Sequence, residues 1–299
     1  MPRLPFSIPW HGGAGRSRLP TAPLLVLLAA APLVLPAAYA AYVVRQSTRR
    51  TTARTTITPP PDRLAPKKKA SGGGGGGGGG VDGEGESEGD TTTIPPAVVL
   101  AAAAAGDYVI ARERVVSEAI PLRRTTRPAG GGERGMLETY LAATMRAFAW
   151  TPQAWLMRAL VARLPGGAAL ARTFDAPHLD ACAFAPGDRV CGVYVVRGRA
   201  RADGDGERVL LDLSAPEGWR GPVVRGVLDC GFVVEEGEGE RCVRFVNETV
   251  LWRHRDAKPT LLEGAVAGRL HAWMVAWMMV RGVDAVVGAA GAEAEAEAA

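Results

Sequence analysis

The chain has 299 residues, of which 47% are hydrophobic, 22% charged and 6% aromatic, and its formal net charge is +4. The basicity belongs to the N-terminus, because residues 1–61 contain seven arginines and no Asp or Glu. These values exclude collagen and coiled coils and disfavour a dedicated nucleic-acid-binding protein, so we expect no nucleic-acid partner. Six of the seven tryptophans and all four cysteines follow residue 149, which indicates one folded domain in the C-terminal part.

Residues 24–44 form an uninterrupted run of 21 uncharged residues, mostly Leu, Val and Ala. A helix of that length spans about 30 Å, the thickness of the hydrocarbon core of a bilayer. The run therefore predicts a single transmembrane helix that follows a basic, disordered N-terminus, residues 1–23. Three arginines precede the run and four follow it within ten residues, so the positive-inside rule places the C-terminal part in the cytoplasm.

Two alternatives remain open for this run. The small residues Ala38 and Ala40 would suit cleavage of a secretory signal whose apolar core covers residues 24–35. The arginine-rich, acid-free residues 1–61 would also suit a mitochondrial presequence. The segment before the run is long for a signal peptide, and the run continues past the cleavage position. Both features favour an uncleaved membrane anchor, with the lipid bilayer as the partner of residues 24–44.

Residues 45–106 pass through threonine-rich, proline-rich and glycine-rich stretches. They contain too few bulky apolar side chains to offset the entropy lost on ordering, so we expect a disordered linker. The glycine tract 72–80 lacks the Lys-Ser/Thr pair that follows a phosphate-binding loop, so it predicts no nucleotide site. The small and acidic residues 289–299 predict a disordered tail.

Residues 107–288 are expected to fold as one α+β domain. An extended segment, 107–122, precedes an amphipathic helix over residues 136–150. Thr151 as N-cap and Pro152 as the first helical residue predict a second helix, which ends near residue 164.

Four later segments alternate with period two and are rich in β-branched and aromatic residues, which predicts strands over 190–196, 208–213, 223–234 and 242–252. Short turns join them, so we expect an antiparallel sheet. A capping box from Thr260 to Glu263 then opens a long helix that ends near residue 283. Charged residues interrupt its apolar stretch, so we interpret it as a core helix rather than a second membrane span.

This order of two helices, an antiparallel sheet and one long C-terminal helix resembles the helix-grip arrangement of START-like (SRPBCC-type) domains. The stretches 152–156, Pro-Gln-Ala-Trp-Leu, and 184–190, Phe-Ala-Pro-Gly-Asp-Arg-Val, carry the resemblance. It implies a curved sheet that wraps the last helix, with a cavity between them. It implies no catalytic residues, because the fold family has no common set.

Histidine beside a carboxylate can act as a general base, because the carboxylate fixes the tautomer of the ring. His178 with Asp180 and Asp188, and His271 in the long helix, are therefore the catalytic candidates. The ordinary explanations are a solvated capping loop and a core histidine. Four tryptophans could line a pocket for an apolar ligand, with core packing as the ordinary explanation: Trp155, Trp252, Trp273 and Trp277.

The four cysteines lack metal-ligand spacing, so we expect no metal and no cofactor. Cys230 and Cys242 flank a predicted hairpin centred near residue 236, where a disulfide is possible in an oxidising compartment. The sequon at Asn247 falls inside a strand and is interpreted as incidental.

Together these patterns favour a single-pass membrane protein whose domain binds a hydrophobic small molecule or lipid. An enzyme that uses a His/Asp pair and a non-catalytic scaffold domain are the alternatives.

Overall fold

A computed structural model describes residues 41–59, 94–125, 135–202, 205–221, 223–237 and 239–298, with side chains as far as residue 288. The chain divides into two compact units, Met1–Val43 and Val44–Ala299, and every element named below belongs to the second. The predicted transmembrane helix 24–44 therefore lies outside the described residues except for its last four.

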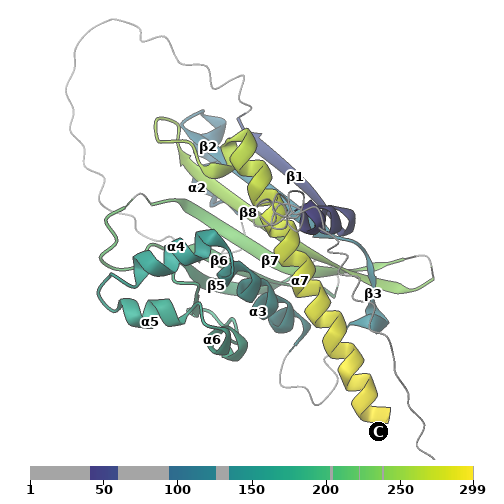
Figure 1. The fold of residues 1–299 in the computed structure, drawn as a ribbon. Helices are drawn as coiled ribbons and strands as arrows, with labels where there is room; N and C mark the ends of the chain where they lie inside the picture. Colours follow the sequence, from purple (N-terminus) through teal and green to yellow (C-terminus); the bar gives the residue numbers. More distant parts are fainter. Residues whose placement is uncertain are drawn as a thin grey trace, which may run out of the picture. The chain divides into compact units, whose positions relative to one another are not determined.

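An antiparallel sheet of eight strands, counted over the described residues, forms the centre of the domain (Figure 1). Seven strands lie in the order β1-β2-β8-β7-β6-β5-β4, and the short β3 pairs with β8. The prediction of an antiparallel sheet is confirmed, and the four predicted strands correspond to β5 to β8. The strands are β1 (Thr51–Thr58), β2 (Tyr108–Ser117), β3 (Ile120–Pro121), β4 (Arg189–Val190), β5 (Tyr194–Arg201), β6 (Glu207–Leu213), β7 (Arg225–Glu236) and β8 (Arg241–His254).

Helices lie on both faces of the sheet, with α3 to α7 on one face and α2 on the other (Figure 1). The α+β class with a C-terminal helix is confirmed. The two predicted helices before the sheet are α3 and α4, and the structure adds two short helices after them. The helices are α2 (Ala97–Ala104), α3 (Met136–Ala149), α4 (Pro152–Val161), α5 (Gly167–Arg172), α6 (Ala176–Ala181) and α7 (Ala265–Ala298).

Local capping explains where two of these helices begin. Thr151 caps α4, because its hydroxyl oxygen accepts a hydrogen bond from the backbone N–H of Ala154 at 3.2 Å. The capping box from Thr260 to Glu263 is also present, but it closes a single 3₁₀ turn, and α7 begins only at Ala265. At its other end α7 continues through the expected disordered tail, where alternating Ala and Glu are good helix formers.

Strand β1 and helix α2 lie within residues 45–106, where we expected a disordered linker. Five of the eight residues of β1 are threonine, whose branched Cβ suits an extended backbone. β1 pairs with β2 along its whole length. Arg50 fixes its start, with the guanidinium 2.8 Å from Glu118 and 2.7 Å from Asp284 of α7. Residues 60–93 therefore connect two elements of the domain and do not precede it.

The main core lies between the sheet and helices α3 and α7. Tyr140 of α3 is fully buried, and its ring stacks on Phe245 of β8 with ring centroids 4.4 Å apart. Its hydroxyl donates a hydrogen bond to the side-chain oxygen of Asn247 at 2.9 Å. α7 passes close to this ring at Gly282, where a Cβ atom would lie 2.6 Å from Cδ2 of Tyr140. The absence of a side chain at Gly282 is thus what allows α3 and α7 to pack so closely.

The opposite face of the sheet is partly apolar and partly charged. α2 packs on a small cluster that includes Val250 and Trp252 of β8. Beyond α2 the exposed strands carry ion pairs, in which Glu248 lies 2.8 Å from Arg112 and 3.4 Å from Arg114. The larger apolar core is therefore on the side of α3 to α7.

The register of β7 and β8 does not place Cys230 and Cys242 opposite each other, as the possible disulfide would require. Cys230 lies opposite Asn247, and Cys242 lies opposite Glu235, because the hairpin turn falls between residues 236 and 241, later than predicted. Both thiols are free. Burial raises the pKa of the Cys230 thiol well above its usual value. Asn247 of the sequon is 2% exposed, which agrees with an incidental match.

Among the described residues, one helical segment is long and apolar enough to cross a membrane. It is Ala265–Gly288 in α7, and 44% of it is buried inside the protein. It packs against α3 and against strands β1, β2 and β8. These contacts with a helix and with the sheet agree with the interpretation of this stretch as a core helix.

Candidate functional site

A cavity of about 290 Å³ lies on the helical side of the sheet. Strands β5 to β8, the loop that follows β6, and helices α4 and α7 contribute its walls. Most of the lining is apolar, with large side chains such as Leu228, Leu251, Met274 and Met278. An apolar space of this kind suits a hydrophobic molecule.

Two helices supply aligned side chains to this cavity. On α4 the lining residues are 153, 157, 160 and 161, and on α7 they are 271, 274, 275 and 278. Spacings of three and four place side chains on one face of a helix. One face of α4 and one face of α7 therefore form part of the cavity wall.

His271 connects the cavity to a buried carboxylate. Its Nδ1 atom lies 2.7 Å from Oε1 of Glu113, and the side chains are 12% and 0% exposed. The second oxygen of Glu113, Oε2, has no hydrogen-bond partner among the described residues. Burying a carboxylate with incomplete hydrogen bonding is costly, so apolar packing does not explain why this pair is here.

No role was predicted for Glu113 from the sequence, although the alternation of buried residues in β2 indicates that its side chain is buried. It lies in β2 at the same parity as the buried residues Val109, Ala111 and Val115. In a strand, residues two apart point to the same face, so a single acidic residue in this row must be buried. Its cross-strand partner is Thr249, which also lines the cavity.

Of the four predicted catalytic candidates, His271 lines the cavity, and the other three lie elsewhere. The exposed His178 has Nε2 3.1 Å from the backbone oxygen of Arg189. Asp180 pairs with Arg146 at 3.2 Å. The partner of His271 is Glu113, which replaces both predicted aspartates in that role.

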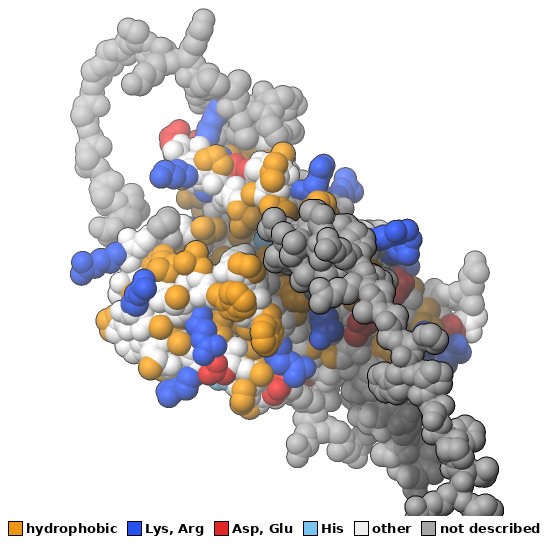
Figure 2. All heavy atoms as spheres, viewed as in Figure 1, with side chains coloured by type: hydrophobic (Ala, Val, Ile, Leu, Met, Phe, Trp, Pro, Cys, Tyr) orange, Lys and Arg blue, Asp and Glu red, His pale blue; other side chains and the backbone are white. Residues whose placement is uncertain are grey.

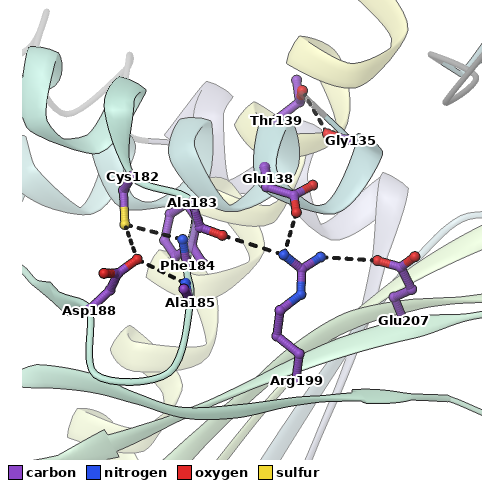
Figure 3. Close-up of polar contacts among 10 residues, drawn as sticks. All are labelled: Gly135, Glu138, Thr139, Cys182, Ala183, Phe184, Ala185, Asp188, Arg199 and Glu207. Carbon is purple, nitrogen blue, oxygen red and sulfur yellow. Dashed lines mark hydrogen bonds and ion pairs between the residues drawn. The ribbon is translucent and has the colours of Figure 1, made fainter. Parts of the chain in front are cut away.

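Asp188 has a structural role in the turn before β4 (Figure 3). Its carboxylate accepts hydrogen bonds from the backbone N–H of Ala185 at 2.8 Å and from the thiol of Cys182 at 3.5 Å. Figure 3 also shows Arg199 of β5 held between Glu138 of α3 and Glu207 of β6. These contacts tie the turn, the helix and the sheet together and give the three carboxylates a structural role.

The four predicted tryptophans lie in four different surroundings, and none of them lines the described cavity. Trp155 on α4 is 57% exposed, and Trp252 is buried under α2 on the opposite face of the sheet. Trp273 lines a groove between α7 and β1, and Trp277 packs against the main core. Trp219, in the loop after β6, is the tryptophan that lines the cavity.

Some apolar residues that line the cavity are exposed to solvent. Val223, Val224 and Leu261 are 61%, 43% and 41% exposed. Figure 2 shows further hydrophobic side chains gathered over α4, where Trp155 and Leu156 are the large exposed ones. The cavity therefore opens onto an apolar part of the surface.

The described residues contain no group of three His, Cys, Asp or Glu side chains that could hold a metal ion. In the comparisons with known proteins, no family model matches the chain, and no curated protein or solved structure shows a significant match.

Proposed function

We propose that the chain is a single-pass membrane protein whose α+β domain binds a hydrophobic small molecule or lipid. The observation that carries the proposal is the apolar cavity between the sheet and helices α4 and α7. Its volume of about 290 Å³ lies just below the range of small-molecule sites, about 300–1,000 Å³.

We further propose that the arrangement is helix-grip-like, which favours the same function. Two helices precede the main strands, and the long α7 packs across the sheet against β1, β2 and β8. A sheet that faces one long helix encloses space where side chains of the two layers do not meet. The cavity lies in that position, with the lining residues of α7 on its wall.

The membrane part of the proposal rests on residues 24–44 and on the apolar surface at the cavity mouth. A ligand that leaves a bilayer must avoid water on its way into the protein, and exposed Val223, Val224 and Leu261 provide such a path. Exposed apolar patches of this kind mark contact with a membrane or an apolar partner.

Lipid extraction from the purified full chain, followed by mass spectrometry, tests the proposal. Leu228→Trp replaces an aliphatic side chain at the cavity wall with a larger indole ring, which fills part of the cavity. It should reduce the amount of co-purified ligand severalfold. Val98→Trp on α2, where the native side chain is 74% exposed on the opposite face, is the matched control and should change nothing. Equal ligand content in the two variants would contradict binding in this cavity.

The His271–Glu113 pair favours an enzyme as the second candidate function. This candidate requires the pair to carry one negative charge: the Glu113 carboxylate would hold the ring through Nδ1–H, and an unprotonated Nε2 would accept a proton from a substrate in the cavity. Incubation of the full chain with 2-decanone in D₂O would then exchange the hydrogens next to the carbonyl. The exchange should disappear in His271→Gln. It should persist in His178→Gln, because His178 is exposed on α6 and does not line the cavity.

A further inference from the structure

The polar group that the cavity presents to a ligand follows from the geometry of His271. Its Nδ1 atom is occupied by Glu113 at 2.7 Å. The other ring nitrogen, Nε2, is on the far side of the imidazole, and no described residue forms a hydrogen bond with it. Because His271 lines the cavity, Nε2 is the ring atom available to a bound molecule.

The number of protons on the pair decides whether Nε2 donates or accepts. Glu113 is 0% exposed, and the described residues supply no Lys or Arg to pair with it. An apolar environment disfavours net charge, so the favoured pair is neutral overall. A neutral pair is either imidazolium with carboxylate or neutral imidazole with carboxylic acid. In both arrangements the proton between the residues is shared along Nδ1···Oε1, and Nε2 carries its own hydrogen.

A donor N–H in an apolar cavity requires an acceptor. An alkane would leave Nε2–H without a partner, which costs binding free energy because the group loses its hydrogen bonds to water. A ligand carboxylate would bury a negative charge in the apolar cavity, where the neutral pair offers no net positive charge to balance it. A carbonyl oxygen accepts the hydrogen bond and adds no charge.

We propose that the ligand is an amphiphile with a neutral carbonyl head, such as a ketone or an ester, whose oxygen accepts a hydrogen bond from Nε2 of His271. The hydrocarbon part of the ligand contacts the apolar lining formed by residues such as Leu228, Met274 and Met278. Glu113 acts as a positioning residue, since it holds the ring and contributes to its protonation but does not line the cavity. This inference rests on the proposed binding function and specifies its ligand class.

Two probes of equal chain length, 2-decanone and decane, test the proposal. Their binding to the full chain, kept in amphipol, is measured by equilibrium dialysis, and the ratio of the two dissociation constants is compared between variants. The double variant Glu113→Val/His271→Leu removes both polar partners together, so it avoids a buried carboxylate without a partner. The preference for the ketone should fall about tenfold in this variant, the effect of one hydrogen bond of about 1.4 kcal/mol. His178→Leu is the control and should keep the wild-type ratio.

The outcomes separate the inference from the function on which it rests. If both probes bind and the double variant keeps the wild-type ratio, the cavity binds apolar molecules and the role of His271 is refuted. If neither probe binds the wild-type chain, both proposals fail. In case the double variant does not fold, His271→Gln provides the second measurement, because an amide N–H₂ at this position should retain part of the ketone preference.

Discussion

The close packing of α3 and α7 predicts a large effect of adding one methyl group at Gly282. A Cβ atom there would lie 2.6 and 2.7 Å from two ring carbons of Tyr140, which is less than real Cβ contacts allow. The ring cannot move away, because it stacks on Phe245 and its hydroxyl is bonded to Asn247. Overpacking of a core costs about 1–3 kcal/mol. Alanine regains up to about 1 kcal/mol of helix propensity over glycine.

We therefore expect Gly282→Ala to destabilise the domain by about 1–2 kcal/mol, which lowers Tm by about 2–8 °C for a domain of this size. The assay is thermal unfolding of the full chain followed by circular dichroism. Gly288→Ala in the same helix is the matched control, because a Cβ there meets no atom within 4 Å. It should be neutral or slightly stabilising. Equal melting temperatures for the two variants would refute the packing argument.

Three further predictions concern other parts of the domain. Burial opposes ionisation of Glu263, but hydrogen bonds, mainly from Arg253, lower its pKa overall. The ionised carboxylate therefore stabilises the folded chain at pH values above the pKa of Glu in the unfolded chain, about 4.3. This contribution is lost as the pH falls through the lower pKa of Glu263 in the folded chain. Denaturant titrations of Glu263→Gln should show a weaker loss of stability in acid than wild type. A maleimide should label Cys242 in the native chain but Cys230 only after unfolding, which mass spectrometry can check. Cutting a protease site placed within the glycine tract 72–80 should leave the domain on membranes, because β1 remains paired with β2; release into the soluble fraction would contradict this.

Much of the fold follows from periodicity and capping in the sequence. Strands β5 to β8 have alternating apolar residues and clear turn signals, and α4 begins at the Thr151-Pro152 pair that predicted it. These features are local, so a single sequence reveals them. The C-terminal helix was predicted for the same reason, although its start was placed before the 3₁₀ turn that ends at Glu263.

The features that sequence reasoning missed depend on contacts between distant residues. The threonine-rich β1 has little hydrophobic character, and it is a strand because β2 offers it an edge with which to pair. The partner of His271 is 158 residues away, so no local pattern links it to Glu113. The four tryptophans were grouped by residue type, but the two faces of the sheet and of α7 separate them.

The pairing of β1 with β2 changes how far the domain can travel from an anchor at residues 24–44. A disordered chain of 62 residues, 45–106, would have a root-mean-square length of about 43 Å. The helical residues between Val44 and Thr51 span only about 10 Å. The accessible volume scales with the cube of this distance, so it shrinks about 80-fold and the effective concentration of bilayer components around the domain rises accordingly. If residues 24–44 anchor the chain as proposed, a domain restrained in this way samples the lipid surface almost continuously, and dissolved molecules deep in the aqueous compartment reach it only by their own diffusion.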